Sequence, residues 1–202
     1  MPVNIDKNLL LKEFKKFDLS SLQDEAEKIA ESKINQIRGE LLNDFENHPV
    51  TREIQAGAEA ENISSTLNGI GNLSTYIGFS PADNPIEPVK NILKTVKINN
   101  KPKRVDSQDG VSFEFEVVSP TIEEIESVGK LPFEQGQSWV KGIENGISGF
   151  GAYIYGKIFK NSRSGKGIQS KISFRNGAFR PVRYLSEIMS KFYLKIKKWK
   201  HN

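Results

Sequence analysis

Apolar residues recur between residues 20 and 47 at the spacing of an α-helix. The steps between them are four, three, five, three, four and four residues, which places them along one face: Leu22, Ala26, Ile29, Ile34, Ile37, Leu41 and Phe45. Ser20 and Ser21 offer N-caps, and Pro49 stops the pattern. We predict a helix over 20–47, about 40 Å long at ~1.5 Å per residue. Its apolar face needs a sheet or a neighbouring subunit to cover it.

Strict alternation of apolar and polar residues marks a strand further along the chain. It runs over 111–118 and predicts a half-buried antiparallel strand, with one covered face: Val111, Phe113, Phe115 and Val117. Residues 73–79 are predicted to be a short strand or an entry to the sheet. A further strand is predicted at 96–98, followed by a turn-rich stretch over 99–110. A β-hairpin is predicted from strands at 152–159 and 168–174, with a basic tip at 160–167.

Short helices and one longer helix complete the pattern. The short ones are predicted at 51–56, 86–94, 120–129 and 138–149. Ser119 and Pro120 are typical of a helix start, as the N-cap and the first helical residue. Pro181 opens the last helix, whose apolar stripe is formed by Val182, Leu185, Ile188, Met189, Phe192, Ile196 and Trp199.

The order of these elements predicts an α+β fold. An antiparallel β-sheet is expected between a long N-terminal helix and a C-terminal helix, with small inserted helices. Residues 1–18 mix charges with a short apolar cluster and are predicted to be an arm, which leaves 19–202 as a single α+β domain. A chain of 202 residues buries enough apolar surface to fold without disulfides.

Composition argues against most enzyme classes. The chain has no cysteine, which excludes disulfides, thiol catalysis and thiolate metal sites. It has two histidines, His48 beside Pro49 and His201 in the C-terminal tail. We interpret His48 as a helix-terminating residue. No cofactor and no metal is expected, and the chain is predicted not to be an enzyme.

Two local patterns are weighed and set aside. The stretch 162–167 resembles a phosphate-binding loop, but the first glycine of that motif and the Ser or Thr after its lysine are missing. It is interpreted as a hairpin tip. The acids Glu123, Glu124 and Glu126 fall in the first turns of a predicted helix, where they offset its dipole.

Charge is unevenly distributed along the chain. Residues 151–202 hold 13 basic residues and one acid, a net +12, whereas residues 1–150 have a net charge of −8. The basic part could meet nucleic acid, an acidic partner, or the acidic part of an identical neighbour. Alternatively, both regions are solvated surfaces.

No signal peptide and no apolar stretch of membrane-spanning length is present, so we expect a cytoplasmic location or a particle assembled there, without membrane contact.

The layout resembles the tail-completion and neck proteins of tailed bacteriophages, which join head and tail. The long helix 20–47 is followed by His48-Pro49-Val50-Thr51, then by 71–77 (Gly-Asn-Leu-Ser-Thr-Tyr-Ile), and 178–182 (Ala-Phe-Arg-Pro-Val) precedes the final helix. The resemblance implies a virion structural protein that is assembled in the host cytoplasm. Such a protein forms a homo-oligomeric ring, and this ring contacts other neck or tail proteins. The alternative is a nucleic-acid-binding protein that uses the basic C-terminal third.

Seven residues are predicted to contact a partner. Two lie in the hairpin tip and five in the basic final helix: Arg163, Lys166, Phe192, Lys195, Lys197, Lys198 and Trp199. The aromatic members could instead pack in the core, because Phe192 and Trp199 fall on the apolar stripe of the helix.

Overall fold

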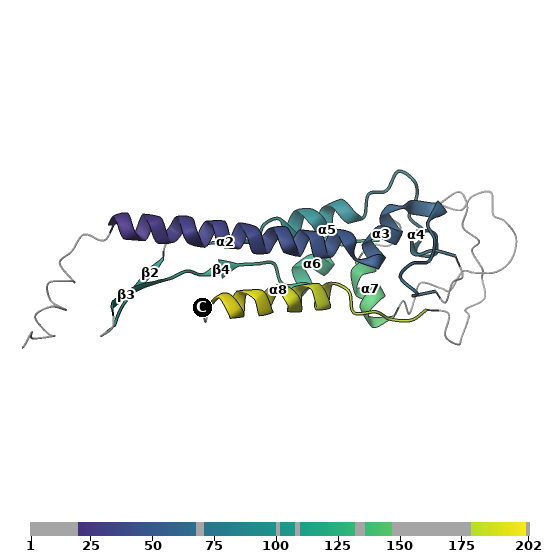
Figure 1. Ribbon diagram of the computed structural model, residues 1–202. Coiled ribbons are helices and arrows are strands. Elements are labelled where there is room, and N and C mark those ends of the chain that lie inside the picture. Colours follow the sequence, from purple (N-terminus) through teal and green to yellow (C-terminus); the bar gives the residue numbers. More distant parts are fainter. Residues whose placement is uncertain are drawn as a thin grey trace, which may run out of the picture. The chain divides into compact units, whose positions relative to one another are not determined.

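The computed structural model describes residues 20–67, 71–99, 102–107, 110–131, 136–146 and 179–200. Helices and antiparallel strands are both present, so the fold class is α+β, as predicted (Figure 1). The chain divides into unit 1, residues 1–36 and 96–118, and unit 2, residues 37–95 and 119–202. That 19–202 is a single domain stays a prediction. The arm 1–18 and the hairpin 152–174 lie outside the described residues.

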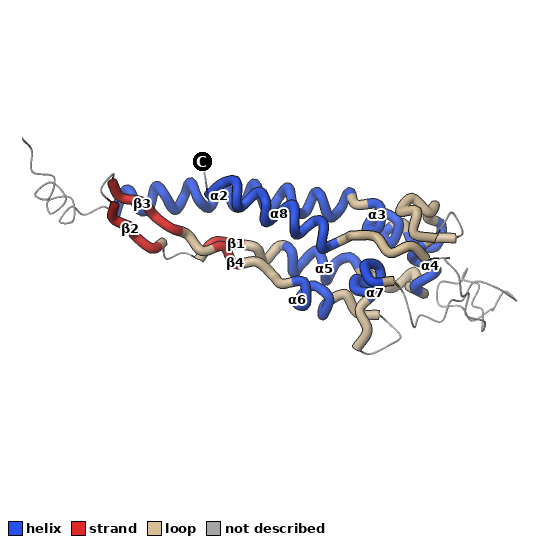
Figure 2. The backbone as a smooth tube through the Cα atoms, turned by 90° about the horizontal axis from the view of Figure 1, so that it is seen from below, coloured by secondary structure: helices blue, strands red, loops and turns tan. Residues whose placement is uncertain are grey.

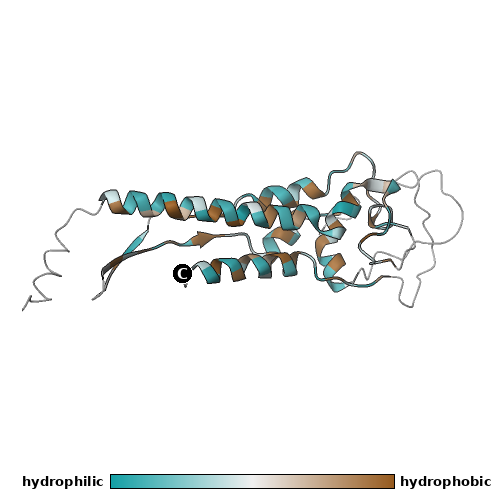
Figure 3. Cartoon of the chain, in the orientation of Figure 1, coloured by the Kyte–Doolittle hydropathy of each residue, from teal (hydrophilic) through white to brown (hydrophobic). Residues whose placement is uncertain are grey.

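The long helix α2 spans Ser20–Asn47, as its periodicity predicts. Its buried row has steps of four, three, four and four residues: Ala30, Ile34, Ile37, Leu41 and Phe45. Leu22 and Ile29 are not covered within the chain, since they are 56% and 61% exposed, and their burial by a neighbouring subunit stays a prediction. The five-residue step from Ile29 to Ile34 explains this, because it turns the helix about 140° beyond a full turn, and Ala30 takes the covered position instead. Apolar and polar residues alternate along α2 in Figure 3.

Unit 1 combines the first part of α2 with a two-stranded ribbon. Strand β1, Lys97–Ile98, pairs with β4, Val117–Val118, and β2, Lys103–Ser107, pairs with β3, Gly110–Glu114; both ladders are antiparallel (Figure 2). Lys103 faces Glu114 across the ribbon, an arrangement that favours this register. Part of the predicted turn 99–110 is therefore strand β2, and the predicted strand 111–118 is interrupted between β3 and β4.

The ribbon leaves its apolar side only half covered. Val111, Phe113, Phe115 and Val117 are neither fully buried nor fully exposed. A face of a ribbon is covered only by an element that packs on it, and two-stranded ribbons without such cover are marginally stable by themselves. Among the described residues of unit 1, the buried apolar side chains are Ala30, Ile34, Val96 and Ile98.

Unit 2 contains the rest of α2 and seven short or medium elements among its described residues. They are α3 (Pro49–Gln55), the 3-10 helix η1 (Gly57–Glu59), α4 (Leu73–Ile77), α5 (Ile86–Leu93), α6 (Ile122–Val128), α7 (Trp139–Asn145) and α8 (Leu185–Lys200). Its core contains large aromatic side chains that are fully buried: Phe45, Trp139, Tyr184 and Phe192.

The starts of α4, α6 and α8 differ from the prediction. Residues 73–79 were predicted as a strand, but they begin as helix α4, because the Asn72 side chain accepts a hydrogen bond from the Thr75 amide at 2.9 Å. Gly78, with φ of 87°, ends that helix in a conformation that glycine adopts without strain. Helix α6 is capped by Thr121 rather than by Ser119, and Thr121 and Glu124 form a capping box.

The last helix begins at Leu185, four residues after Pro181. The start is fixed by Glu144 of α7, whose carboxylate accepts hydrogen bonds from the backbone amides of Tyr184 and Ser186 at 3.3 and 2.7 Å. A negative charge at this end also offsets the helix dipole. The buried residues of α8 are on the predicted stripe, whereas Ile196 and Trp199 are half-buried.

Candidate functional site

The predicted partner residues on α8 have three different environments. Phe192 is 1% exposed and belongs to the core of unit 2. Lys197 and Lys198 are exposed, and Trp199 is half-buried. Arg163 and Lys166 lie outside the described residues. That any of these predicted residues contacts a partner stays a prediction.

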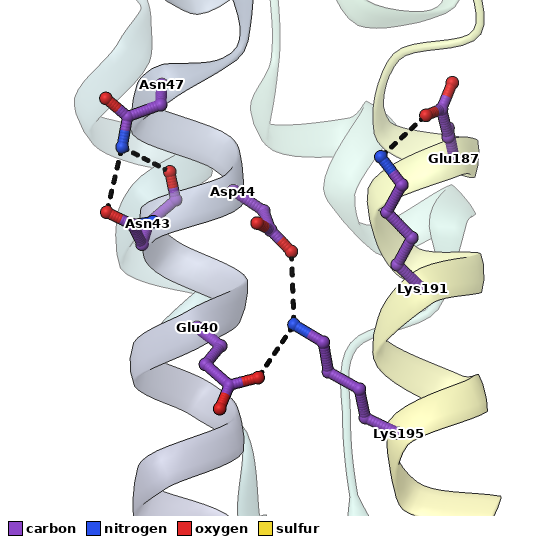
Figure 4. A network of polar contacts seen from close by, with 7 residues as sticks. All are labelled: Glu40, Asn43, Asp44, Asn47, Glu187, Lys191 and Lys195. Carbon is purple, nitrogen blue, oxygen red and sulfur yellow. Dashed lines mark hydrogen bonds and ion pairs between the residues drawn. The ribbon is translucent and has the colours of Figure 1, made fainter.

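Lys195 makes ion pairs within its own unit. Its Nζ lies 2.8 Å from Glu40 and 3.4 Å from Asp44, both on α2, so α8 and this part of α2 are joined by one lysine (Figure 4). The hydrogen bond to Glu40 raises the pKa of Lys195 above its usual value. One turn back on α8, Lys191 pairs with Glu187 at 2.7 Å. The positive charge of these two lysines is thus partly balanced by neighbours on α2 and α8.

Exposed apolar side chains lie on α2 and α8. Leu22 and Ile29 on α2 are separated by seven residues, or about two turns, so they project from one side of the helix. Tyr193 and Leu194 on α8 are 47% and 57% exposed. The Tyr193 hydroxyl shares a hydrogen bond with Ser119, whereas Leu194 stands one turn before Lys197.

A buried aromatic cluster fixes the junction of α2, α3 and α8. The Tyr184 ring contacts those of Phe45, His48 and Trp139, with ring centroids 6.2, 4.8 and 6.1 Å away. Its hydroxyl is 2.6 Å from the Thr51 hydroxyl. Burial raises the pKa of Tyr184, so the phenol stays neutral and keeps its hydrogen bond.

His48 lies between two helices, as its interpretation as a terminator predicts. Helix α2 ends at Asn47, and His48 caps α3, because its Nδ1 accepts a hydrogen bond from the Val50 amide at 3.3 Å. Only an unprotonated Nδ1 can accept it. Burial lowers the pKa of His48; Glu187 and Glu144 act against this, and Lys191 acts with it.

Glu53 of α3 organises the loop that leads to α4. The residue is buried, and its carboxylate accepts hydrogen bonds from three donors. These are the Asn62 side chain at 2.8 Å, the Ser64 amide at 2.9 Å and the Leu73 amide at 2.7 Å. The three bonds compensate for the loss of water around the carboxylate. Glu53 therefore joins α3, the loop and the start of α4.

An open polar depression of about 480 Å³ lies between α6 and α7. Glu123, Glu126 and Lys141 line it, and Lys141 Nζ is 4.0 Å from Glu126. Glu123 lies in the first turn of α6 and Glu124 in its capping box, the positions in which acids offset the helix dipole. Across the described ranges, no three metal-ligating side chains gather in one place.

Several of these residues could not be found from the sequence alone. Glu53 and Glu144 gave no signal, because acids in short helices are usually solvated and their partners lie far along the chain. Leu194 did give a signal in the sequence, because it is a large apolar residue that does not belong to the apolar stripe of its helix. For Ile29, the signal was the five-residue step to Ile34.

Comparisons with protein-family models, with curated protein sequences and with solved structures found no match. In the described parts of the chain, every helix is too short or too polar to cross a membrane.

Proposed function

We propose that this chain is a non-enzymatic structural protein that assembles with copies of itself into a ring. Its place would be the neck or tail end of a tailed phage particle, assembled in the host cytoplasm beside other virion proteins. The assignment to phage is supported by the resemblance of the layout alone. Self-assembly is supported by a surface property of the chain.

That property is the exposed apolar side of α2. Leu22 and Ile29 are more than half exposed, although large aliphatic side chains gain about 1.5–3 kcal/mol each on full burial. The half-covered apolar side of the ribbon lies in the same unit. Grouped apolar side chains at a surface are typical of protein–protein contacts.

The test is the mass of the purified chain in solution. Sedimentation equilibrium at low and high salt should give a multiple of the 22.7 kDa chain mass. Salt should reduce assembly only in part, because apolar contacts survive the screening of charges. A chain that stays monomeric at high concentration in both buffers would contradict the proposal.

Nucleic-acid binding is the function that we would assign in place of self-assembly. Binding through lysines must weaken steeply with salt, because each phosphate contact releases counterions. The same experiment is therefore run with and without duplex DNA. A monomer that binds DNA with a steep dependence on salt would favour this alternative. Lys197 and Lys198 are the exposed lysines to reverse in that case.

A further inference from the structure

Asn145 presents an exposed side-chain amide at the end of α7. It is the last residue of that helix, and Gly146 follows it directly. Its side chain makes no hydrogen bond with the described residues. By contrast, the equally exposed Asn47 at the end of α2 donates from its amide to the side chain of Asn43 at 2.8 Å. The carbonyl carbon of the Asn145 side chain is therefore open to attack.

Gly146 places an unhindered backbone nitrogen next to this amide. Its φ of 89° and ψ of 138° are outside the helical region, and glycine adopts them without strain. In a continuing helix its amide would donate to the Gly142 carbonyl, but it forms no hydrogen bond with any described residue. Because glycine has no side chain, nothing of its own shields the nitrogen.

Water reaches both residues. Asn145 and Gly146 line the open polar depression between α6 and α7, together with Glu126 and Lys141. An amide side chain, a neighbouring backbone nitrogen without a hydrogen bond and access for water are the three requirements for an intramolecular loss of ammonia. All three meet at the end of α7.

We propose that Asn145 is a site of spontaneous deamidation. The Gly146 nitrogen attacks the side-chain carbonyl carbon of Asn145, and the new C–N bond closes a succinimide ring. That nitrogen gives its proton to solvent base, and the side-chain nitrogen takes a proton from water and leaves as ammonia. Water then adds to either carbonyl of the ring and opens it, which gives aspartate or isoaspartate. No oxidant or cofactor takes part, and the reaction does not depend on the proposed function.

The reaction replaces a neutral amide by a carboxylate. At position 145 this carboxylate lies at the C-terminal end of α7, where the helix dipole disfavours a negative charge. It also lies one turn after Lys141, whose Nζ is 4.0 Å from Glu126, so the two carboxylates compete for one lysine. Stored protein should therefore contain a more acidic form, which isoelectric focusing detects.

The test is peptide mapping of the full chain by mass spectrometry. The folded protein is kept at mildly acidic and at mildly alkaline pH in water enriched in a heavy oxygen isotope. The peptide with Asn145 should change from amide to acid and take up the label, because water opens the ring. The change should be faster at alkaline pH, since base removes the proton of the Gly146 nitrogen. Peptides with Asn-Gly at 68–69 and 176–177, outside the described residues, are mapped separately.

Two controls are matched to the site. The peptide with Asn47 should stay amidated, because its amide is hydrogen bonded and the next residue, His48, is bulky. Asn145→Gln keeps an exposed amide in the same place, but its ring would be one atom larger and closes far more slowly. This variant should lose the labelling, and circular dichroism should show an unchanged fold, because glutamine is a good helix former.

Three results would overturn the inference. One is a wild-type Asn145 peptide that takes up no more label than the Asn47 peptide. The second is an Asn145→Gln peptide that is labelled as fast as the wild type, because the reaction then does not pass through Asn145. The third is labelling that appears only when the chain is unfolded in urea, because α7 would then protect the residue.

Discussion

Removing the buried Glu53 carboxylate should destabilise unit 2 strongly. In Glu53→Ala, the donors on Asn62, Ser64 and Leu73 lose their acceptor at once. Hydrogen bonds to a charged group contribute about 1.5–3 kcal/mol each, offset by the cost of burying the charge. We expect the free energy of unfolding to fall by about 3–5 kcal/mol, a large part of the ~5–15 kcal/mol of a typical domain.

The assay is urea unfolding at neutral pH, followed by far-UV circular dichroism. Glu53→Gln keeps one side-chain oxygen but places an amide NH₂ near one of the donors, so its loss should be smaller, about 1–3 kcal/mol. Glu61→Ala is the matched control, because Glu61 is an exposed acid in the same region. Its effect should stay below about 0.5 kcal/mol. If Glu53→Ala loses no more than this control, the carboxylate does not hold the loop.

Three further predictions concern α2, the aromatic cluster and its histidine. Leu41→Ala should lower the free energy of unfolding by ~2–5 kcal/mol, because Leu41 is buried. Ile29→Ala should change that of the dissociated chain, at low concentration, by less than about 1 kcal/mol, because Ile29 is exposed there. Tyr184→Phe should cost about 1–2 kcal/mol, since the buried Thr51 hydroxyl loses its partner. Burial lowers the pKa of His48 below 6.5, so the unfolded chain binds more protons just below pH 6.5. Stability should therefore fall as pH drops from 6.5 through the lowered value. Urea midpoints measure all three.

The matched variant for the histidine is His48→Asn. Asparagine can accept the cap hydrogen bond but does not titrate in this range. As the pH drops through that window, the wild type should lose stability relative to this variant. Outside the window the difference between the two proteins should stay constant. Parallel profiles for the two proteins would show that His48 does not sense pH. For Leu41→Ala and Tyr184→Phe, losses under about 0.5 kcal/mol would contradict the packing described above.

Long periodic patterns predicted elements well, and short ones did not. The bounds of α2 follow from its seven apolar residues and its flanking signals. Residues 73–79 are too few to distinguish a helical period from an alternating one. There, Asn72 and Gly78 were the better signals, because they cap the two ends of α4. Strand β2 is polar and exists through its pairing with β3, which no local pattern encodes.

The candidate site was predictable in charge but not in detail. The net charge of α8 can be counted from the sequence, but the pairing of Lys195 with Glu40 and Asp44 joins positions about 150 residues apart. The fate of each lysine is decided by such long-range contacts. The exposure of an apolar residue likewise depends on whether another element packs on it, and this follows from the whole fold rather than from the local sequence.

The contacts between α7 and the start of α8 link the stability of the two helices. The Ile143 carbonyl accepts a hydrogen bond from the Val182 amide at 3.2 Å, and the Glu144 carboxylate accepts hydrogen bonds from the amides of Tyr184 and Ser186. Helix α7 has seven residues, too few to be stable in isolation. If α7 unfolds, three backbone amides at the start of α8 lose their acceptors at once. We therefore expect α7 and the first turn of α8 to open together, as one cooperative element of unit 2.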